Sequence, residues 1–307
     1  MSKYPAITAD GKITRASRAS ALVFVLILPT IATAYAITQS CLHGFKREDL
    51  LIFSGMYVLN GLGVTVGYHR LFTHRSFSTY RPIRYLLALL GCMAAEGAPV
   101  IWASQHRAHH ASSDQEGDPH SPWVGRKPGV FGAFKALLFA HYGHVFFQKE
   151  PIDPDRFAPD LAREPFLCWL ERWAAIPVVA GFLIPGAIGY GIHGTWSGAC
   201  GGLLWGGFVR LFLITHATGS VNSICHMFGS RTFDTGDQAR NNYWLMPVTL
   251  GESFHSGHHA FPTSARHGLR WWEIDPSWCV IWCLEKVGLA SNVVRVSRER
   301  VKERLSL

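Results

Sequence analysis

The chain has 307 residues and a formal net charge of +8, and 48% of its residues are hydrophobic while only 16% are charged. This charged share is well below the roughly 25% of ordinary soluble domains, which argues against a soluble globular protein. The length allows one large domain or two small ones. We predict a single domain over residues 1–307.

Four apolar runs are long enough to cross a bilayer, whose hydrocarbon core needs about 20 apolar residues. A weaker run over residues 83–101 ends in a polar stretch at Glu96. We expect that run to lie at the membrane interface without crossing. The predicted spans are residues 20–38, 50–68, 173–192 and 198–218.

Lys and Arg are distributed unevenly around these spans: four lie in residues 1–19, twelve in 69–172 and ten in 219–307. The first hairpin loop holds only Lys46 and Arg47, and the second holds none. Because cytoplasmic segments carry the excess of positive charge, both termini and the long central segment are predicted to be cytoplasmic. Residues 69–172 and 219–307 would then form a cytosolic helical cap on an all-α integral membrane protein. The excess of Lys and Arg over acidic residues therefore indicates membrane orientation and contact with lipid headgroups, not nucleic-acid binding.

Histidines gather in three short motifs, YHRLFTH, QHRAHH and FHSGHH, and a further one, His226, lies in VNSICH. These four segments are called histidine boxes below. Imidazole is the commonest side-chain metal ligand, and a cluster this dense suits Fe, Zn, Cu or Ni better than Mg or Ca. One tetrahedral zinc needs only four ligands, so a set of this size implies two metal ions. The box histidines are His69, His74, His106, His109, His110, His226, His255, His258 and His259.

The spacing within the boxes predicts how they are presented. His106, His109 and His110 are spaced i, i+3, i+4, and the same spacing recurs in FHSGHH. On an α-helix it places three imidazoles on one face. His69 and His74 are five residues apart, which turns them about 140° out of register on a continuous helix. Either the second span ends between them or they serve different metals.

Two further sets of residues are the carboxylates near the boxes and the histidines that stand alone in the sequence. Nearby carboxylates could accept the N–H on the far side of a ligating imidazole and so fix the ring. The candidates for this role are Asp114, Glu116, Asp118, Asp234, Asp237 and Glu252. The isolated histidines, expected to be ordinary polar residues, are His43, His141, His144, His193, His216 and His267.

Longer stretches around the boxes occur in a recognisable order: GYHRLFTHRSF, WASQHRAHH followed by SDQEGDPHS, VNSICHMFGSRTFDTGD and GESFHSGHHAFP. In these stretches the chain resembles the membrane-bound fatty acyl desaturases, and the likeness runs over about residues 67–305. The resemblance implies four spans under a cytosolic helical cap that holds a di-iron site. It also implies that the nine box histidines are iron ligands and that Asn222 reaches one iron through water.

The resemblance further implies an oxidoreductase that reduces O2 to two waters while it introduces a cis double bond, at Δ9, into a saturated acyl chain. TSARHGLRWWEIDPSW and DRFAPDLAREPF are similar to the acyl-lipid desaturases of plastids and photosynthetic bacteria. A fatty acyl-CoA and an acyl lipid both stay open as substrates, and the likeness favours the lipid. The expected location is a bacterial inner membrane, with the active site on the cytoplasmic side.

Three positions are predicted to line the acyl tunnel: Glu96, Trp102 and Gly219. The family usually has a Trp where this chain has Gly219, so we expect extra space there and an altered chain length or double-bond position. Relatives carry a neutral residue in place of Glu96. A carboxylate buried without a partner is costly, so we expect Glu96 to be paired, protonated or exposed.

Electrons for this chemistry must come from another protein. The sequence has no motif for a Cys-ligated cluster and no Rossmann-type glycine fingerprint. We therefore expect a separate ferredoxin, cytochrome b5-like protein or reductase. Arg107, Arg126, Lys127 and Arg240 are candidates to steer an acidic carrier, although membrane topology alone would also produce these charges.

Two rival functions fit parts of the pattern. A di-iron hydroxylase would insert oxygen after a single hydrogen abstraction, and the boxes alone do not separate it from a desaturase. The resemblance outside the boxes favours desaturation. A non-catalytic metal transporter or sensor would place ligands along a path through the spans, whereas here they gather on one side.

Overall fold

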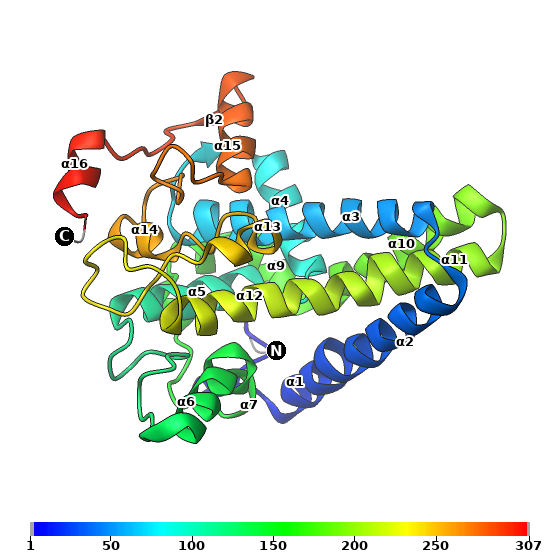
Figure 1. Cartoon of the computed structure of the whole chain (residues 1–307), viewed down its shortest axis with the longest axis horizontal. Coiled ribbons are helices and arrows are strands. Elements are labelled where there is room, and N and C mark those ends of the chain that lie inside the picture. Colours follow the sequence, from blue (N-terminus) through cyan, green and yellow to red (C-terminus); the bar gives the residue numbers. More distant parts are fainter. Residues whose placement is uncertain (1–2, 306–307) are drawn as a thin grey trace.

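The computed structural model describes residues 3–305 and is mostly helical, with almost no sheet. In the described residues, four helices are long and apolar enough to cross a membrane, as predicted. They extend together toward one end of the molecule, and the shorter helices gather at the other end (Figure 1). The spans are Arg15–His43 (α1 Arg15–Ser20, η1 Ala21–Ile27, α2 Leu28–His43), Arg47–Thr73 (α3 Arg47–Leu62, η2 Gly63–Thr73), Ala175–His193 (α10) and Trp196–Met227 (α11 Trp196–Gly202, η5 Leu203–Val209, α12 Arg210–Met227).

Three of these helices run further than the apolar runs that predicted them. The second continues to Thr73 and the fourth to Met227, so both carry box histidines beyond their apolar part. Hydropathy marks only the portion that a bilayer core can hold, whereas backbone hydrogen bonding continues into the polar cap. A box histidine of the fourth helix, His226, is therefore fixed by the same helix that forms the span.

The remaining helices form the cap. Its two short strands pair antiparallel, with Ser78 opposite Ser291. The elements of the cap are β1 (Ser78–Thr79), α4 (Arg81–Met93), α5 (Pro99–Ala111), α6 (Gly129–Leu138), η3 (Phe139–Gly143), α7 (His144–Phe146), α8 (Pro154–Phe157), η4 (Leu161–Arg163), α9 (Pro165–Trp173), η6 (Tyr243–Leu245), α13 (Met246–Thr249), α14 (His255–Ala260), α15 (Pro276–Lys286), β2 (Ala290–Ser291) and α16 (Arg298–Glu303).

The weaker apolar run over residues 83–101 is not one helix. It is divided between α4 and α5, and the break holds Ala95 and Gly97 at positive φ, 56° and 96°. The carboxylate of Glu171 in α9 accepts the backbone N–H of Val100 at 2.6 Å and so satisfies the free N-terminus of α5. This buried contact fixes the start of the helix that carries the second box.

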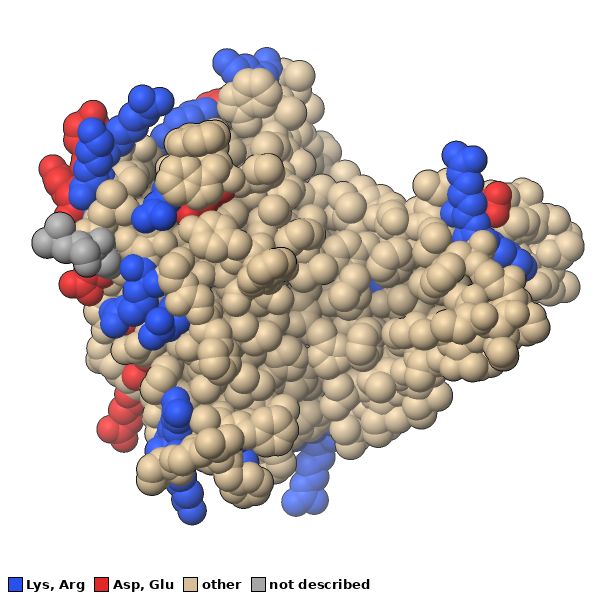
Figure 2. Space-filling view, viewed as in Figure 1, with Lys and Arg blue, Asp and Glu red and all other residues tan. Residues whose placement is uncertain are grey.

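The main core lies where the spans enter the cap. Tyr68, Phe72, Leu167, Leu170 and Ile281 are all fully or almost fully buried there, around η2. The outer faces of the spans have the opposite character: the surface between their tips and the cap is nearly free of charged side chains (Figure 2). Such a continuous apolar surface is expected to face lipid.

The one arginine of the fourth span, Arg210, is completely buried and donates to three backbone carbonyls. Its guanidinium reaches Met93 and Gly181, each at 2.8 Å, and Gly206 at 3.1 Å. These bonds join α12 to α4 and α10. A charged side chain inside a span is therefore satisfied by carbonyl oxygens, as such residues usually are.

Candidate metal centre

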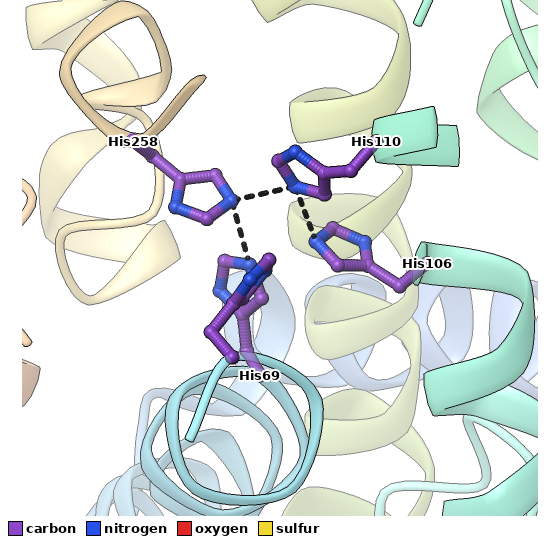
Figure 3. A group of neighbouring side chains, drawn as sticks. His69, His106, His110 and His258 are labelled. Carbon is purple, nitrogen blue, oxygen red and sulfur yellow. Dashed lines mark hydrogen bonds between the residues drawn. The ribbon is translucent and has the colours of Figure 1, made fainter. Parts of the chain in front are cut away.

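The nine box histidines lie in two neighbouring groups. Within each group, one ring nitrogen of every residue lies within 4.8 Å of those of the others. Four members of the first group point their rings at one another from three separate segments (Figure 3). The first group is His69, His74, His106, His110 and His258, and the second is His109, His226, His255 and His259.

Helix α5 contributes to both groups, and so does α14. His106 and His110 of α5 join the first group, while His109 joins the second. The spacing predicts three imidazoles on one face of a helix, and the structure divides those three between the two groups. Residues i and i+4 differ by about 40° around an α-helix, whereas i+3 lies about 100° from i+4. This offset lets one short helix place ligands in two adjacent groups.

His69 and His74 both belong to the first group, although they are five residues apart. The helix ends at Thr73, between them, as one of the two alternatives predicted. Its last turns are π-helical, and the N–H of His74 donates to the carbonyl of His69 at 3.1 Å. An i to i+5 bond widens the turn and closes the angle that an α-helix would leave. The alternative that the two residues serve different sites is not observed.

Four of the predicted carboxylates hold box histidines by Nδ1, with distances between nitrogen and oxygen of 2.5 to 2.9 Å. Each N–H donor on Nδ1 leaves Nε2 unprotonated and directed into its group. Glu116 and Asp234, also considered, are exposed. The pairs are His69 with Glu252, His109 with Asp118, His226 with Asp114 and His259 with Asp237.

The ring nitrogens fit a pair of transition-metal ions. The Nε2 atoms of His74, His109 and His259 are buried without a hydrogen-bond partner among the described residues, and such orphaned atoms are rare in proteins. Elsewhere Nε2 faces Nε2, as between His69 and His258 at 3.0 Å. Two unprotonated nitrogens cannot bond to each other, but both can bind one cation. An all-imidazole donor set suits Fe, Zn, Cu or Ni.

Electrostatics in the groups also favour a cation. Burial, followed by repulsion from the neighbouring imidazoles, holds the pKa of His74, His106, His110, His258 and His259 well below the usual histidine value. These rings are therefore neutral near pH 7, with lone pairs free for a metal.

Sequence reasoning missed two histidines that lie against the groups. His267, taken as an isolated residue, is fully buried with its ring centroid 4.4 Å from that of His258, and its Nδ1 lies 3.2 Å from Glu252. His120 is also buried, and its ring centroid is 4.4 Å from that of His109. The sequence could have indicated His120, because it lies two residues after Asp118, a candidate partner of a box histidine. Nothing in the sequence around His267 indicates that it lies beside the groups.

Two cavities meet at the first histidine group. The smaller is walled mainly by apolar side chains of α3, η2 and α12, such as Val64 and Ile214. The larger has a more polar lining that includes Gln105 and His144. The residues that line both cavities are Trp102, His106, Thr218 and Asn222.

The predicted tunnel residues lie at these cavities. The ring of Trp102 is stacked on His106 at a centroid distance of 5.0 Å. Glu96 and Gly219 line the larger cavity. The space beside Gly219 is not open, however, because a Cβ there would lie 2.7 Å from the carbonyl oxygen of His141. The space that a larger side chain at this position would need is filled by η3, which packs directly on α12.

Glu96 combines two of its expected states. It is half-buried, hydrogen-bonds to Thr218, and burial raises its pKa to about 8. The carboxyl group is therefore both paired and largely protonated at neutral pH.

Comparisons with known proteins agree with this geometry. The sequence pattern of the fatty acid desaturase family matches residues 50–278. A hex-5-enoyl-[acyl-carrier protein] acetylenase of Moorena producens is 43% identical over 270 residues, which cover 87% of this chain and 83% of the relative. An sn-2 palmitoyl-lipid 9-desaturase of Nostoc is 39% identical and covers 85% and 86% of the two chains. An sn-1 stearoyl-lipid 9-desaturase of Anabaena variabilis is 38% identical and covers 77% and 80%.

Proposed function

Because the chain belongs to the fatty acid desaturase family, we propose that it introduces a cis double bond, at Δ9, into a saturated acyl chain carried by a membrane lipid or CoA. Two iron ions would be held by the nine box histidines, with Asn222 reaching one of them through water. The observation that carries this proposal is the placement of two adjacent imidazole groups where two cavities meet.

The reaction removes two hydrogens from neighbouring CH2 groups, which no amino-acid side chain can do. When bound, the irons supply that oxidising power with O2 and two external electrons. The overall balance is R–CH2–CH2–R′ + O2 + 2 e⁻ + 2 H⁺ → R–CH=CH–R′ + 2 H2O. The carboxylates on Nδ1 keep the imidazoles oriented, as Glu252 does for His69.

The cavities suggest how the chain would be oriented. The smaller cavity, with its apolar wall of Val64 and Ile214, suits the methyl end. The larger, with Gln105 and His144 in its lining, suits the carboxyl end and its carrier. Trp102 stands between the two and would hold one CH2 pair beside His106.

The match to the acetylenase favours a second candidate. An enzyme of that kind would act on an acyl chain that already has a double bond, and its carrier would be an acyl carrier protein. The histidine groups would serve both reactions, because each removes two hydrogens from neighbouring carbons. The product separates the two candidates.

The test is the fatty-acid profile, with double-bond positions, of a desaturase-deficient bacterial host that expresses the chain together with a ferredoxin. We expect a new cis-Δ9 monoene that disappears in the His110→Ala variant. A terminal alkyne would support the acetylenase, and a hydroxylated acid would move the chain to the hydroxylases. Normal product from His110→Ala would overturn the assignment.

We also propose that the cap and both termini face the cytoplasm of a bacterial inner membrane. The proposal is supported by the positive charge, since 26 of the 29 Lys and Arg residues lie in residues 1–19, 69–172 and 219–307. Labelling of the exposed cysteines in intact cells with a membrane-impermeant maleimide tests it.

A further inference from the structure

The second histidine group approaches the polar surface of the cap at one tryptophan. The indole Nε1 of Trp123 donates to the carbonyl oxygen of His226 at 2.8 Å. Trp123 is half-buried in the loop between α5 and α6, whereas His226 is fully buried. A single hydrogen bond thus links a partly exposed aromatic ring to the backbone of a box histidine.

Positive charge surrounds this tryptophan. The guanidinium of Arg126 lies over the Trp123 ring at 4.6 Å, and the exposed Lys127 follows it. Arg240 comes from a different segment: its backbone N–H donates to the carbonyl of Cys225 at 2.7 Å, next to His226 in the chain. Two arginines from separate loops therefore lie at the end of α12, and Lys127 follows one of them in the chain.

Three of the five carboxylates on these two loops face the histidine groups, and Glu116 and Asp234 are exposed. Asp114, Asp118 and Asp237 each accept a hydrogen bond from the Nδ1 atom of a box histidine. Arg107, the fourth candidate of the sequence analysis, is not available for steering. It is held by the backbone carbonyls of Phe72 and Thr73 and by Asp160.

We propose that Trp123, Arg126, Lys127 and Arg240 form the docking surface for an acidic one-electron carrier protein, and that electrons enter the metal centre through Trp123 and His226. The inference rests on the proposed function, which requires two external electrons for each double bond. Each docked carrier is oxidised by one electron, so two docking events supply the pair. O2 accepts four electrons in all, two from the carriers and two with the two hydrogens removed from the acyl chain. Two protons from water complete the two water molecules that form.

The surface suits such a partner for two reasons. Opposite charge accelerates the encounter of two proteins and orients them, in a way that salt weakens. The ring and the hydrogen bond then provide a short bonded path, from the indole through one carbonyl into the residue whose imidazole lies in the second group. His226 lies in the last turn of α12, at its cap end, so a soluble carrier can reach Trp123 from the aqueous side.

The experiment measures binding and electron transfer separately, using the purified full-length protein with a plant-type ferredoxin and with cytochrome b5. Binding is titrated at two salt concentrations. Reduction is followed by stopped flow, and its rate is divided by the rate with reduced methyl viologen, a small donor that needs no docking surface. The charge-reversal variant is Arg126→Glu/Arg240→Glu. Its matched control, Arg163→Glu/Lys286→Glu, makes the same charge change elsewhere on the cap.

We expect the charge reversal to raise the Kd for at least one carrier tenfold or more and to reduce the salt dependence, while the control stays within twofold of the wild type. At saturating carrier, Trp123→Phe should lower the ratio of carrier-driven to viologen-driven rates at least tenfold. Trp271→Phe, at a strongly exposed tryptophan, is its control.

The proposal is overturned if neither carrier binds the wild type, or if the variants behave like their controls. Failure of the proposed function looks different, because no unsaturated product would then form from the wild type even with viologen. Bound metal is measured in every variant to show whether the histidine groups are intact. If the charge-reversal variant has lost its metal, Lys127→Glu replaces it.

Discussion

Arg70 shows how a residue that touches no metal can orient one that does. Its guanidinium is completely buried between two carboxylates, Glu252 and Asp275, and Glu252 in turn holds Nδ1 of His69. Removing one partner of a buried ion pair leaves an uncompensated charge, which typically costs several kcal/mol. Without Arg70, Glu252 would take up a proton and compete less well for the N–H of His69.

We therefore expect Arg70→Met to weaken metal binding about 10- to 100-fold, the range found for groups that orient metal ligands. Arg84→Met is the control, because it breaks the half-buried pair with Glu164, which holds no box histidine. Metal content after dialysis against a chelator checks the prediction. Equal retention by both variants would show that the carboxylate holds His69 without help from Arg70.

Glu96 predicts a pH dependence of stability. Burial raises its pKa to about 8, so between its unfolded value of 4.5 and pH 8 the folded protein keeps a proton that the unfolded chain releases. Stability therefore falls as the pH rises through this window and levels off above it. Glu96→Gln removes the effect. We expect the melting temperature of the variant to rise relative to the wild type from pH 5 to pH 8, and a difference that stays constant with pH would contradict this account.

At the scale of single elements, η2 depends on a close helix contact. A Cβ on Gly63 would lie 2.3 Å from the backbone nitrogen of Gly91 in α4, too close for any side chain. The approach sets the position of the π-helical turn that ends at the first box. A Cβ on Gly55, in the preceding helix α3, would meet no atom within 4 Å.

Gly63→Ala should consequently lower the melting temperature by several degrees and reduce bound metal, because η2 must move away from α4. Gly55→Ala should leave both unchanged or raise the melting temperature slightly, since alanine favours a helix over glycine by about 1 kcal/mol. Thermal unfolding in detergent checks both. Similar melting temperatures for the two variants would mean that α4 yields at this contact.

The elements also show what the sequence alone can predict. The nine box histidines and four of their carboxylate partners were found from residue type and spacing. Their division into two groups was not, because it depends on the angle between α5 and α14 rather than on either sequence. The π-helical turn after Gly63 and the contact of His267 were equally hidden, since both arise from packing between segments far apart in the chain.

For the whole molecule, hydropathy predicted the number and the approximate positions of the spans. The cap was predictable only as helical, because its short elements are held by long-range contacts such as the one between Glu171 and Val100. The expectation for Gly219 shows the limit of reasoning from a missing side chain. The space it leaves is taken by His141, which the sequence does not place beside it.

The orientation of the molecule can be tested with its own cysteines. Cys41 and Cys200 are exposed near the tips of the spans, and Cys279 and Cys283 are exposed in the cap. In intact cells a membrane-impermeant maleimide that reaches the periplasm should label the first pair alone. The second pair should react only after the inner membrane is opened. Labelling of the cap pair in intact cells would reverse the proposed topology.

The central claim is that two adjacent imidazole groups hold two metal ions in one chain. The most direct test is the number of transition-metal ions per purified protein, measured by mass spectrometry. We predict two per chain, and a loss of about one when His106 and His110 of the first group are both replaced by alanine. One ion or fewer in the folded wild type, or two retained in that variant, would contradict the account.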